Sequence, residues 1–155
     1  MADYRYGKTV SDVASSDNLI INTLLYGIKW EESAIGSPIT LTYSFPYTTN
    51  STALWSSDYN YYGSEPNASE VFGLNETQRD AARSALQSWA NVANITFVEV
   101  EESGNTVGDI RFAFSSAVTD AWGWSYLPSN DAFSGDIWIN PNMDASNLDF
   151  SAGGY

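Results

Sequence analysis

The segment from Asn75 to Val100 constrains the fold most, because it places one helix directly before one strand. Gln78 follows Asn75 at the spacing of a capping box, which predicts that a helix begins at residue 76. Apolar residues then recur at helical spacing until about residue 92, and the set expected to face the core is Ala82, Leu86, Trp89, Val92 and Ala93. Residues 95–100 alternate between apolar and polar side chains, as a half-buried strand does.

Further strands are predicted on both sides of this unit. Residues 39–45 alternate strictly between Pro38 and Pro46, and residues 109–114 place Ile110, Phe112 and Phe114 on one face. Shorter runs at 122–127 and 135–140 each end at a proline. The order of one strand, one helix and then four strands favours an α+β fold, with a mixed twisted sheet of about five strands and one long helix.

Two other stretches are less regular. Residues 1–18 are polar, whereas residues 19–30 are apolar and predict a short helix or an irregular packed segment, so we divide the chain into 1–18 and 19–155. The connection at 47–74 shows no strong periodicity. A connection of this length in a compact domain points to a functional or partner-covered loop.

Composition excludes several kinds of chemistry. The 155 residues include no Cys and no His, so disulfides, thiol nucleophiles and imidazole bases or ligands are absent from this sequence. A net charge of −13 argues against nucleic acid and anionic membranes as partners. No apolar run reaches the length of a membrane-spanning helix, and the first residues do not resemble an export signal peptide.

Several collinear segments resemble the serralysin-type zinc metalloproteases of the metzincin clan. The main one is LQSWANVANITFVEV at 86–100, which is similar to the first helix and second strand of that family. PITLTYSFP at 38–46, GDIRF at 108–112, and WSYLP at 124–128 followed by GDIW at 135–138 agree in order. The resemblance covers residues 19–155 and implies the metzincin upper subdomain of a secreted enzyme that hydrolyses peptide bonds.

The resemblance also has a clear limit. The family's zinc helix carries the motif H-E-x-x-H-x-x-G-x-x-H, in which three His bind Zn²⁺ and the Glu activates a water. SAGGY at 151–155 is similar to the loop before that helix. The resemblance therefore implies the N-terminal part of the protease domain, with zinc, and possible calcium sites, formed by residues outside this sequence. We expect no catalytic or metal-binding residue here and no activity from this chain alone.

A substrate-binding strand is the site that the resemblance implies. In metzincins one strand runs antiparallel to the others at the lip of the cleft and pairs with the peptide substrate. The matching residues are Trp122, Gly123, Trp124, Ser125 and Tyr126. Taken alone, the three aromatic residues could equally alternate between core and surface. The alternative function is a naturally truncated, non-catalytic module that binds a peptide or a partner.

A sheet without the zinc helix would expose an apolar face. At roughly 25 cal/mol per Å², a helix-sized footprint is worth on the order of 10 kcal/mol, comparable to the stability of a whole domain. We therefore expect the remaining part of the protease domain, or a self-associated copy, to cover this face.

The remaining candidates have simpler interpretations. Asp131, Asp136, Asp144 and Asp149 are interpreted as solvated loop acids rather than a Ca²⁺ site, because their spacing matches no known calcium loop. Glu99, Glu101 and Glu102 are expected to be solvent-facing charges at the end of a strand. Trp89, Tyr43 and Trp138 occupy positions with core periodicity.

Overall fold

The protein is described by a computed structural model that covers residues 2–3, 8–31, 34–47, 70–103, 106–131 and 133–142. Its elements in chain order are β1 Ala2–Asp3, β2 Val10–Asp12, α1 Leu19–Leu24, β3 Ile28–Trp30, β4 Ile39–Ser44, β5 Val71–Phe72, α2 Glu76–Ala90, β6 Ile95–Glu99, β7 Thr106–Val107, β8 Ile110–Ser115, β9 Gly123–Ser125 and β10 Asp136–Ile139.

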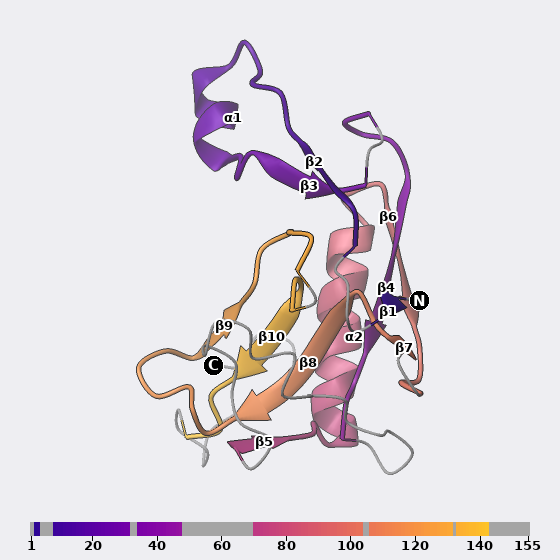
Figure 1. Cartoon of the computed structure of the whole chain (residues 1–155), viewed down its shortest axis with the longest axis vertical. Helices are drawn as coiled ribbons and strands as arrows, with labels where there is room; N and C mark the ends of the chain where they lie inside the picture. The colour runs from indigo at the N-terminus through magenta and orange to yellow at the C-terminus, as the bar shows by residue number, and fades with distance from the viewer. Residues whose placement is uncertain are drawn as a thin grey trace.

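The main sheet has the strand order β6-β4-β8-β10-β9, with β5 paired to β8 beside this path (Figure 1). β6, β4, β8 and β10 are mutually parallel, whereas β9 is antiparallel to β10 and β5 is antiparallel to β8. The expected α+β fold is confirmed, with a mixed sheet and one longer helix. The short strand β5 lies at the end of the segment that we expected to be a loop, and residues 48–69 of that segment lie outside the described residues.

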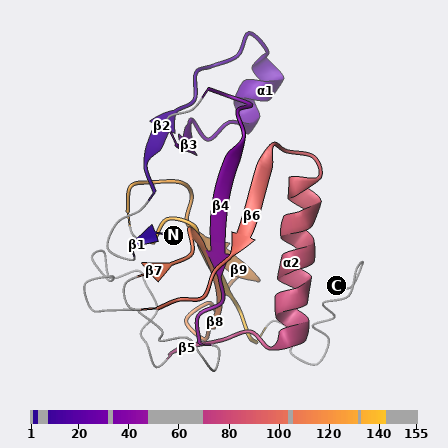
Figure 2. The same cartoon turned by 90° about the vertical axis from the view of Figure 1, so that its right-hand side faces the viewer.

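Helix α2 begins where the sequence predicts. The Asn75 side chain accepts a hydrogen bond from the Gln78 N–H (3.0 Å), and the Gln78 side chain accepts one from the Asn75 N–H (2.8 Å). The helix runs alongside β6 and β4 (Figure 2). Between helix and sheet lies the main core, formed by Leu41, Tyr43, Phe45, Leu74, Leu86, Ile110, Phe112 and Phe114.

Part of the predicted core-facing stripe of α2 is wrong. Leu86 is buried, but Trp89 is 65% exposed and Val92 is 80% exposed. Helical spacing tells which direction a side chain points, but it carries no information on how far the sheet extends beneath the helix. Trp89 lies in the last turn of α2, where the described residues leave the apolar stripe uncovered.

A smaller core lies on the other face of the sheet. Val71, Ala113, Val118 and Trp138 are buried there, and Tyr47, Trp124 and Tyr126 pack against them.

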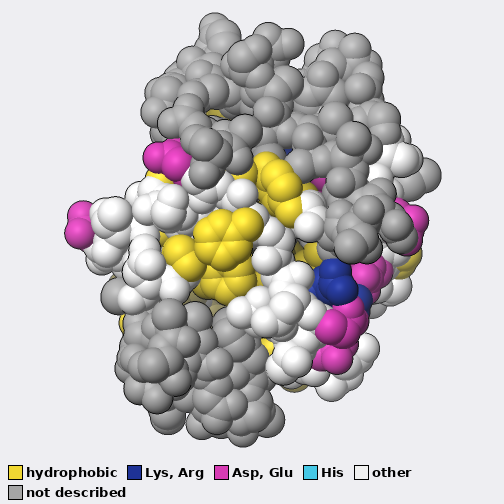
Figure 3. Space-filling model, turned by 90° about the horizontal axis from the view of Figure 1, so that it is seen from below, with side chains coloured by type: hydrophobic (Ala, Val, Ile, Leu, Met, Phe, Trp, Pro, Cys, Tyr) yellow, Lys and Arg dark blue, Asp and Glu magenta, His cyan; other side chains and the backbone are white. Residues whose placement is uncertain are grey.

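At the β5 end of the molecule, Phe72 is 46% exposed and its ring stacks on Phe114 with centroids 5.3 Å apart. Seen from below, hydrophobic side chains gather near the centre of this end, with acidic and basic side chains to one side (Figure 3).

β2, α1 and β3 form an arm that extends from one end of the sheet, whereas β1 pairs with β7 (Figure 1). β2 and β3 pair antiparallel, and α1 lies between them. Of the two alternatives expected for residues 19–30, the structure has a short helix, which ends at Leu24 and is followed by β3. Its apolar side chains are not packed, since Leu19 is 78% exposed and Leu24 is 81% exposed. Within the described residues, no helix combines the length and hydrophobicity needed to cross a bilayer.

Two acidic side chains expected on the surface are buried instead. Glu102 is 3% exposed and Asp136 is 1% exposed, so the solvent-facing interpretation is wrong for both. Glu102 is neutralised by Arg111, which donates from Nε to Oε1 at 2.7 Å. A sequence pattern cannot show that a guanidinium from a neighbouring strand meets this carboxylate. Asp144 and Asp149 lie outside the described residues, and Asp131 is exposed.

Candidate functional site: the antiparallel edge strand

Strand β9 is the outermost strand at the β10 end of the main sheet. It is antiparallel to β10, with Gly123 opposite Ile139, Trp124 opposite Trp138 and Ser125 opposite Ile137. The structure therefore places all five residues of the expected substrate-binding segment in or next to one edge strand. The strand itself is shorter than the predicted 122–127 run.

The backbone N–H and C=O groups of successive residues in this segment point alternately toward β10 and away from it. Toward β10, the Trp122 carbonyl accepts from the Asn140 N–H (2.9 Å), and the Tyr126 N–H donates to the Asp136 carbonyl (3.1 Å). In an antiparallel ladder, the residues between such pairs direct their N–H and C=O groups to the opposite side. Gly123 and Ser125 therefore turn their backbone groups outward, and no other described strand pairs with them there.

The two faces of β9 differ in character. Because directly opposed residues share a face, Gly123 and Ser125 lie on the same side as Ile139 and Ile137, which pack against the main core beside α2. Trp124 lies on the other side, against the core that contains Trp138. The edge is thus lined by small side chains on the helix-covered face and by aromatic side chains on the opposite face.

Close packing fixes β9 against β10. A Cβ added to Gly123 would lie 2.6 Å from the Trp138 carbonyl oxygen, which is closer than real Cβ contacts allow. Asn140, 1% exposed, donates from Nδ2 to the Ala121 carbonyl at 2.9 Å and so fixes the chain just before the strand. These contacts hold the outer edge in an extended form before any ligand arrives.

Ser134 fixes the chain just after β9. Its hydroxyl donates to the Leu127 carbonyl (3.3 Å) and accepts from the Ser129 N–H (2.9 Å). The same oxygen accepts from the Trp30 indole N–H at 3.2 Å, which joins the N-terminal arm to this loop. Sequence reasoning missed Ser134 and Trp30, because nothing local signals a contact between residues 104 positions apart.

The buried charges of the described residues serve the scaffold. Glu102 accepts from both Arg111 and the Ser44 hydroxyl (2.8 Å). Asp109 accepts from the Thr42 N–H (2.8 Å) and hydroxyl (3.0 Å), which ties β4 to the start of β8. Burial raises the pKa of the Tyr47 hydroxyl above its usual range, so this group stays neutral at ordinary pH. None of these groups lines the outer edge of β9.

The residues of this chain do not fit the zinc site of the resembled family. That site needs three His, and the sequence contains none. Among the described residues, no three acidic side chains come together as a cation site would require. Of the loosely spaced acids near the end of the sequence, only Asp131 and Asp136 lie within the described residues, and neither belongs to such a group there.

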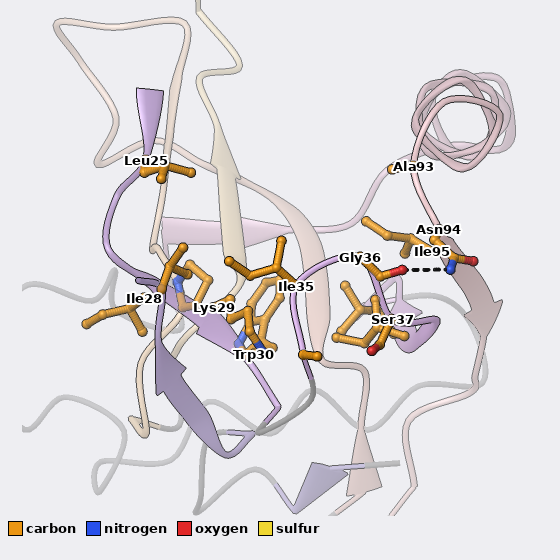
Figure 4. Close-up of a pocket in the computed structure, with 15 residues that line it drawn as sticks. Leu25, Ile28, Lys29, Trp30, Ile35, Gly36, Ser37, Ala93, Asn94 and Ile95 are labelled. Carbon is orange, nitrogen blue, oxygen red and sulfur yellow. Dashed lines mark hydrogen bonds between the residues drawn. The ribbon is translucent and has the colours of Figure 1, made fainter. Parts of the chain in front are cut away.

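A hollow lies between the arm and the sheet (Figure 4). It has a volume of about 430 Å³ and is lined mainly by apolar side chains, including Trp30, Ile35 and Ile95. The Asn94 amide donates to the Gly36 carbonyl at 3.0 Å across its rim. Its lining brings together β3, the turn before β4 and the start of β6, and it includes no Asp, Glu or His. The Lys29 amino group donates to the Glu31 carbonyl at 2.7 Å.

No protein-family model matches the chain. It is 35% identical over 128 residues to metallopeptidase AprA of Pseudomonas marginalis, which covers 81% of this chain and 24% of that protein. It is 32% identical over 123 residues to serralysin A of Dickeya chrysanthemi, covering 76% and 23% respectively. A serralysin of Photorhabdus luminescens is 36% identical over 89 residues, covering 56% and 18%.

These relatives belong to the family that the collinear segments of the sequence resemble. The chain spans less than a quarter of the length of each of these three relatives. It is therefore a distant homologue of the serralysin metalloproteases, matched over an N-terminal segment of them.

Proposed function

We propose that this chain forms the substrate-pairing sheet of a secreted, serralysin-like zinc metalloendopeptidase. The observation that carries the proposal is the outward-facing, antiparallel edge strand β9 in a chain homologous to serralysins. An extended peptide adds to such an edge as one more strand, and main-chain hydrogen bonds supply its affinity. The protein or peptide substrate would pair with the backbone of Gly123 and Ser125.

The chemistry of peptide-bond cleavage is assigned to residues outside this sequence. A zinc ion bound by His would supply the Lewis acid, and this chain contains no His to hold it. What these residues do is hold and orient the peptide backbone. Asn140 and Ser134 keep the two ends of the edge strand in place, so the peptide meets a preformed ladder.

The face of strands β10 and β9 on the α2 side is only partly covered, which supports the packing of a further element there. Ile137 and Ile139 lie on the α2 side but are only partly buried, and their opposite neighbours on β9 are the small residues Ser125 and Gly123. A helix could approach closely over such small side chains. We infer that the zinc-binding part of the protease domain covers this strip, and a self-associated copy is the competing occupant.

The pairing is tested by blocking one outward N–H group. Ser125→Pro removes this donor on the solvent side of an edge strand, a position at which proline is tolerated. Ser125→Ala is the matched variant, since it changes the same side chain while keeping the backbone N–H. We expect Ser125→Pro to weaken binding of extended peptides strongly relative to Ser125→Ala, while the thermal unfolding midpoints of the two variants stay close.

Binding is measured by titrating ¹⁵N-labelled protein with short peptides and following the Gly123 and Ser125 amide signals. Peptides N-methylated on the strand-facing amides should lose binding, whereas methylation of the alternate amides should have little effect. Equal binding by the proline and alanine variants would contradict the pairing.

The assignment of the cleavage chemistry to residues outside this sequence is tested separately. With added Zn²⁺, the 155-residue chain should give no chelator-sensitive cleavage of casein. The coding sequence downstream of codon 155 should contain an in-frame H-E-x-x-H motif. Chelator-sensitive proteolysis by the chain alone would contradict this assignment, and a stop codon would favour a non-catalytic peptide-binding module.

A further inference from the structure

The edge strand carries a row of aromatic side chains on the face away from α2. Trp124 and Tyr126 pack against the smaller core, and the Tyr126 ring lies 4.7 Å from the Phe133 ring. Trp122 is the exception, because it is 58% exposed although it belongs to the same alternating row. A large apolar side chain is therefore presented to solvent beside the free edge.

The register tells which part of a paired peptide would meet this row. If a peptide pairs with Gly123 and Ser125, the residue between its two paired positions lies opposite Trp124. Its side chain then falls on the aromatic face, where Trp122 is a diagonal neighbour. Diagonal neighbours on one face of a sheet are roughly 7–8 Å apart at the backbone, which is within reach of an aromatic side chain.

The neighbouring peptide residues meet a different surface. They lie opposite Gly123 and Ser125, on the face that carries no large side chain from β9. These positions impose little side-chain preference. Selectivity from this strand is thus concentrated on the aromatic face. It acts on the peptide residue opposite Trp124 and on the residue two positions along, which lies opposite Trp122 itself.

Charge distinguishes further between possible side chains at the position opposite Trp124. The described basic residues are all engaged within the chain: Lys8 and Lys29 contact Glu31, Arg79 and Arg83 pair with Glu76, and Arg111 pairs with Glu102. The chain as a whole carries −13. Asp120, two positions before Trp122, is exposed. An acidic peptide side chain here would find an aromatic surface and a negative field.

We propose that Trp122 is a specificity-determining residue, which selects extended peptides with an aromatic, aliphatic or basic side chain opposite Trp124 and disfavours acidic ones. The proposal rests on the peptide pairing proposed above. Apolar side chains would pack on the Trp122 indole, and a Lys or Arg side chain would form a cation–π interaction with the face of that ring. The backbone ladder supplies affinity, and Trp122 supplies the preference.

The test uses a peptide series that differs only at the position opposite Trp124, with Phe, Lys, Ser or Glu there. In the wild-type chain, the Phe and Lys peptides should bind about two- to fivefold more tightly than the Ser peptide, and the Glu peptide more weakly. Added salt should reduce the advantage of Lys but not that of Phe.

Two variants separate the role of Trp122 from general effects. Trp122→Ala should remove the advantage of the Phe and Lys peptides while leaving binding of the Ser peptide nearly unchanged, and Trp122→Phe should restore part of it. Trp89→Ala is the matched control, because Trp89 is also an exposed tryptophan, 65% exposed, but lies on α2. It should leave the whole series unchanged.

The outcomes distinguish this proposal from the one on which it rests. If peptides bind and Ser125→Pro blocks them, but Trp122→Ala keeps the same order of preference, the role of Trp122 is overturned and the pairing stands. If no peptide in the series binds the wild-type chain, both proposals are overturned.

Discussion

Arg111 and Glu102 form a two-pronged ion pair in the interior of the protein. Arg111 Nε lies 2.7 Å from Glu102 Oε1, and Arg111 Nη2 lies 2.9 Å from Glu102 Oε2. Both side chains are almost completely removed from solvent, with exposed fractions of 1% and 0%. The Ser44 hydroxyl also donates to Glu102, so the pair links β8, β4 and the segment after β6.

Removing one member of this pair should be costly. Glu102→Gln removes the charged acceptor of two Arg111 hydrogen bonds, and Arg111→Met leaves the buried Glu102 carboxylate without its guanidinium partner. A buried charge without its partner destabilises a protein by about 3–5 kcal/mol. Urea unfolding should show losses of this order for each single variant. The double variant, with both charges replaced, should lose less than the sum, and strictly additive losses would contradict the coupling.

The capping box at the start of α2 should contribute measurably to stability. Asn75→Ala removes the acceptor for the Gln78 N–H and should cost about 1 kcal/mol. Asn75→Asp keeps an acceptor at this position and is the matched control. Chemical unfolding followed by circular dichroism measures both, and an Asn75→Ala variant as stable as the Asp variant would argue against the cap.

Stability should decline at acid pH through Glu99. The hydrogen bonds from Arg83, at 2.8 and 2.9 Å, hold the pKa of Glu99 below its ordinary value of 4.5. A carboxylate with a lowered pKa in the folded state stabilises it fully above about pH 4.5, and this contribution is lost as the pH falls through the lower folded value. Because the side chain is 40% exposed, the effect should be small.

Glu99→Gln provides the measurement for this carboxylate. It should flatten part of the decline in unfolding free energy below pH 4.5, since Gln does not titrate. Glu101→Gln removes the same charge from an exposed neighbouring residue and is the matched control. Identical profiles for wild type and Glu99→Gln would show that this ion pair does not contribute.

The Ser134 hydroxyl should couple the arm to the edge strand. Ser134→Ala leaves the Trp30 indole and the Ser129 N–H without their acceptor. An unsatisfied buried donor costs about 1–3 kcal/mol, so the contact between arm and loop should open more often. Hydrogen exchange should speed up at residues 28–30 and 126–129 but not in the middle of α2. Ser88→Ala, an exposed serine on α2, should change neither region.

The sequence contained most of the information on local structure. Periodicity located α2, β4, β6, β8 and β10 because a side-chain repeat of 3.6 or 2 follows from backbone geometry alone. The sequence also predicted the first residue of α2 correctly, because the Asn75–Gln78 capping box acts within a single helical turn. It also identified the five residues of the edge segment, although only through resemblance to a family.

The tertiary structure decided what these patterns leave open. Trp89 and Leu86 share a helical stripe, yet Trp89 is exposed because burial depends on how far the sheet reaches. Glu102 is of a residue type that is normally exposed, but it is buried because Arg111 approaches it from another strand. β5 was missed, since two residues show no repeat.

The candidate site shows the same division. The sequence alone determined that 122–127 is extended and rich in aromatic residues, because alternation and a following proline act between close neighbours along the chain. Only the tertiary structure decided that this strand is the outermost one, that Gly123 and Ser125 face outward, and that Trp122 rather than Trp124 is exposed. The physical reason is that strand order and burial arise from contacts between distant residues, such as Trp30 and Ser134, which no local pattern records.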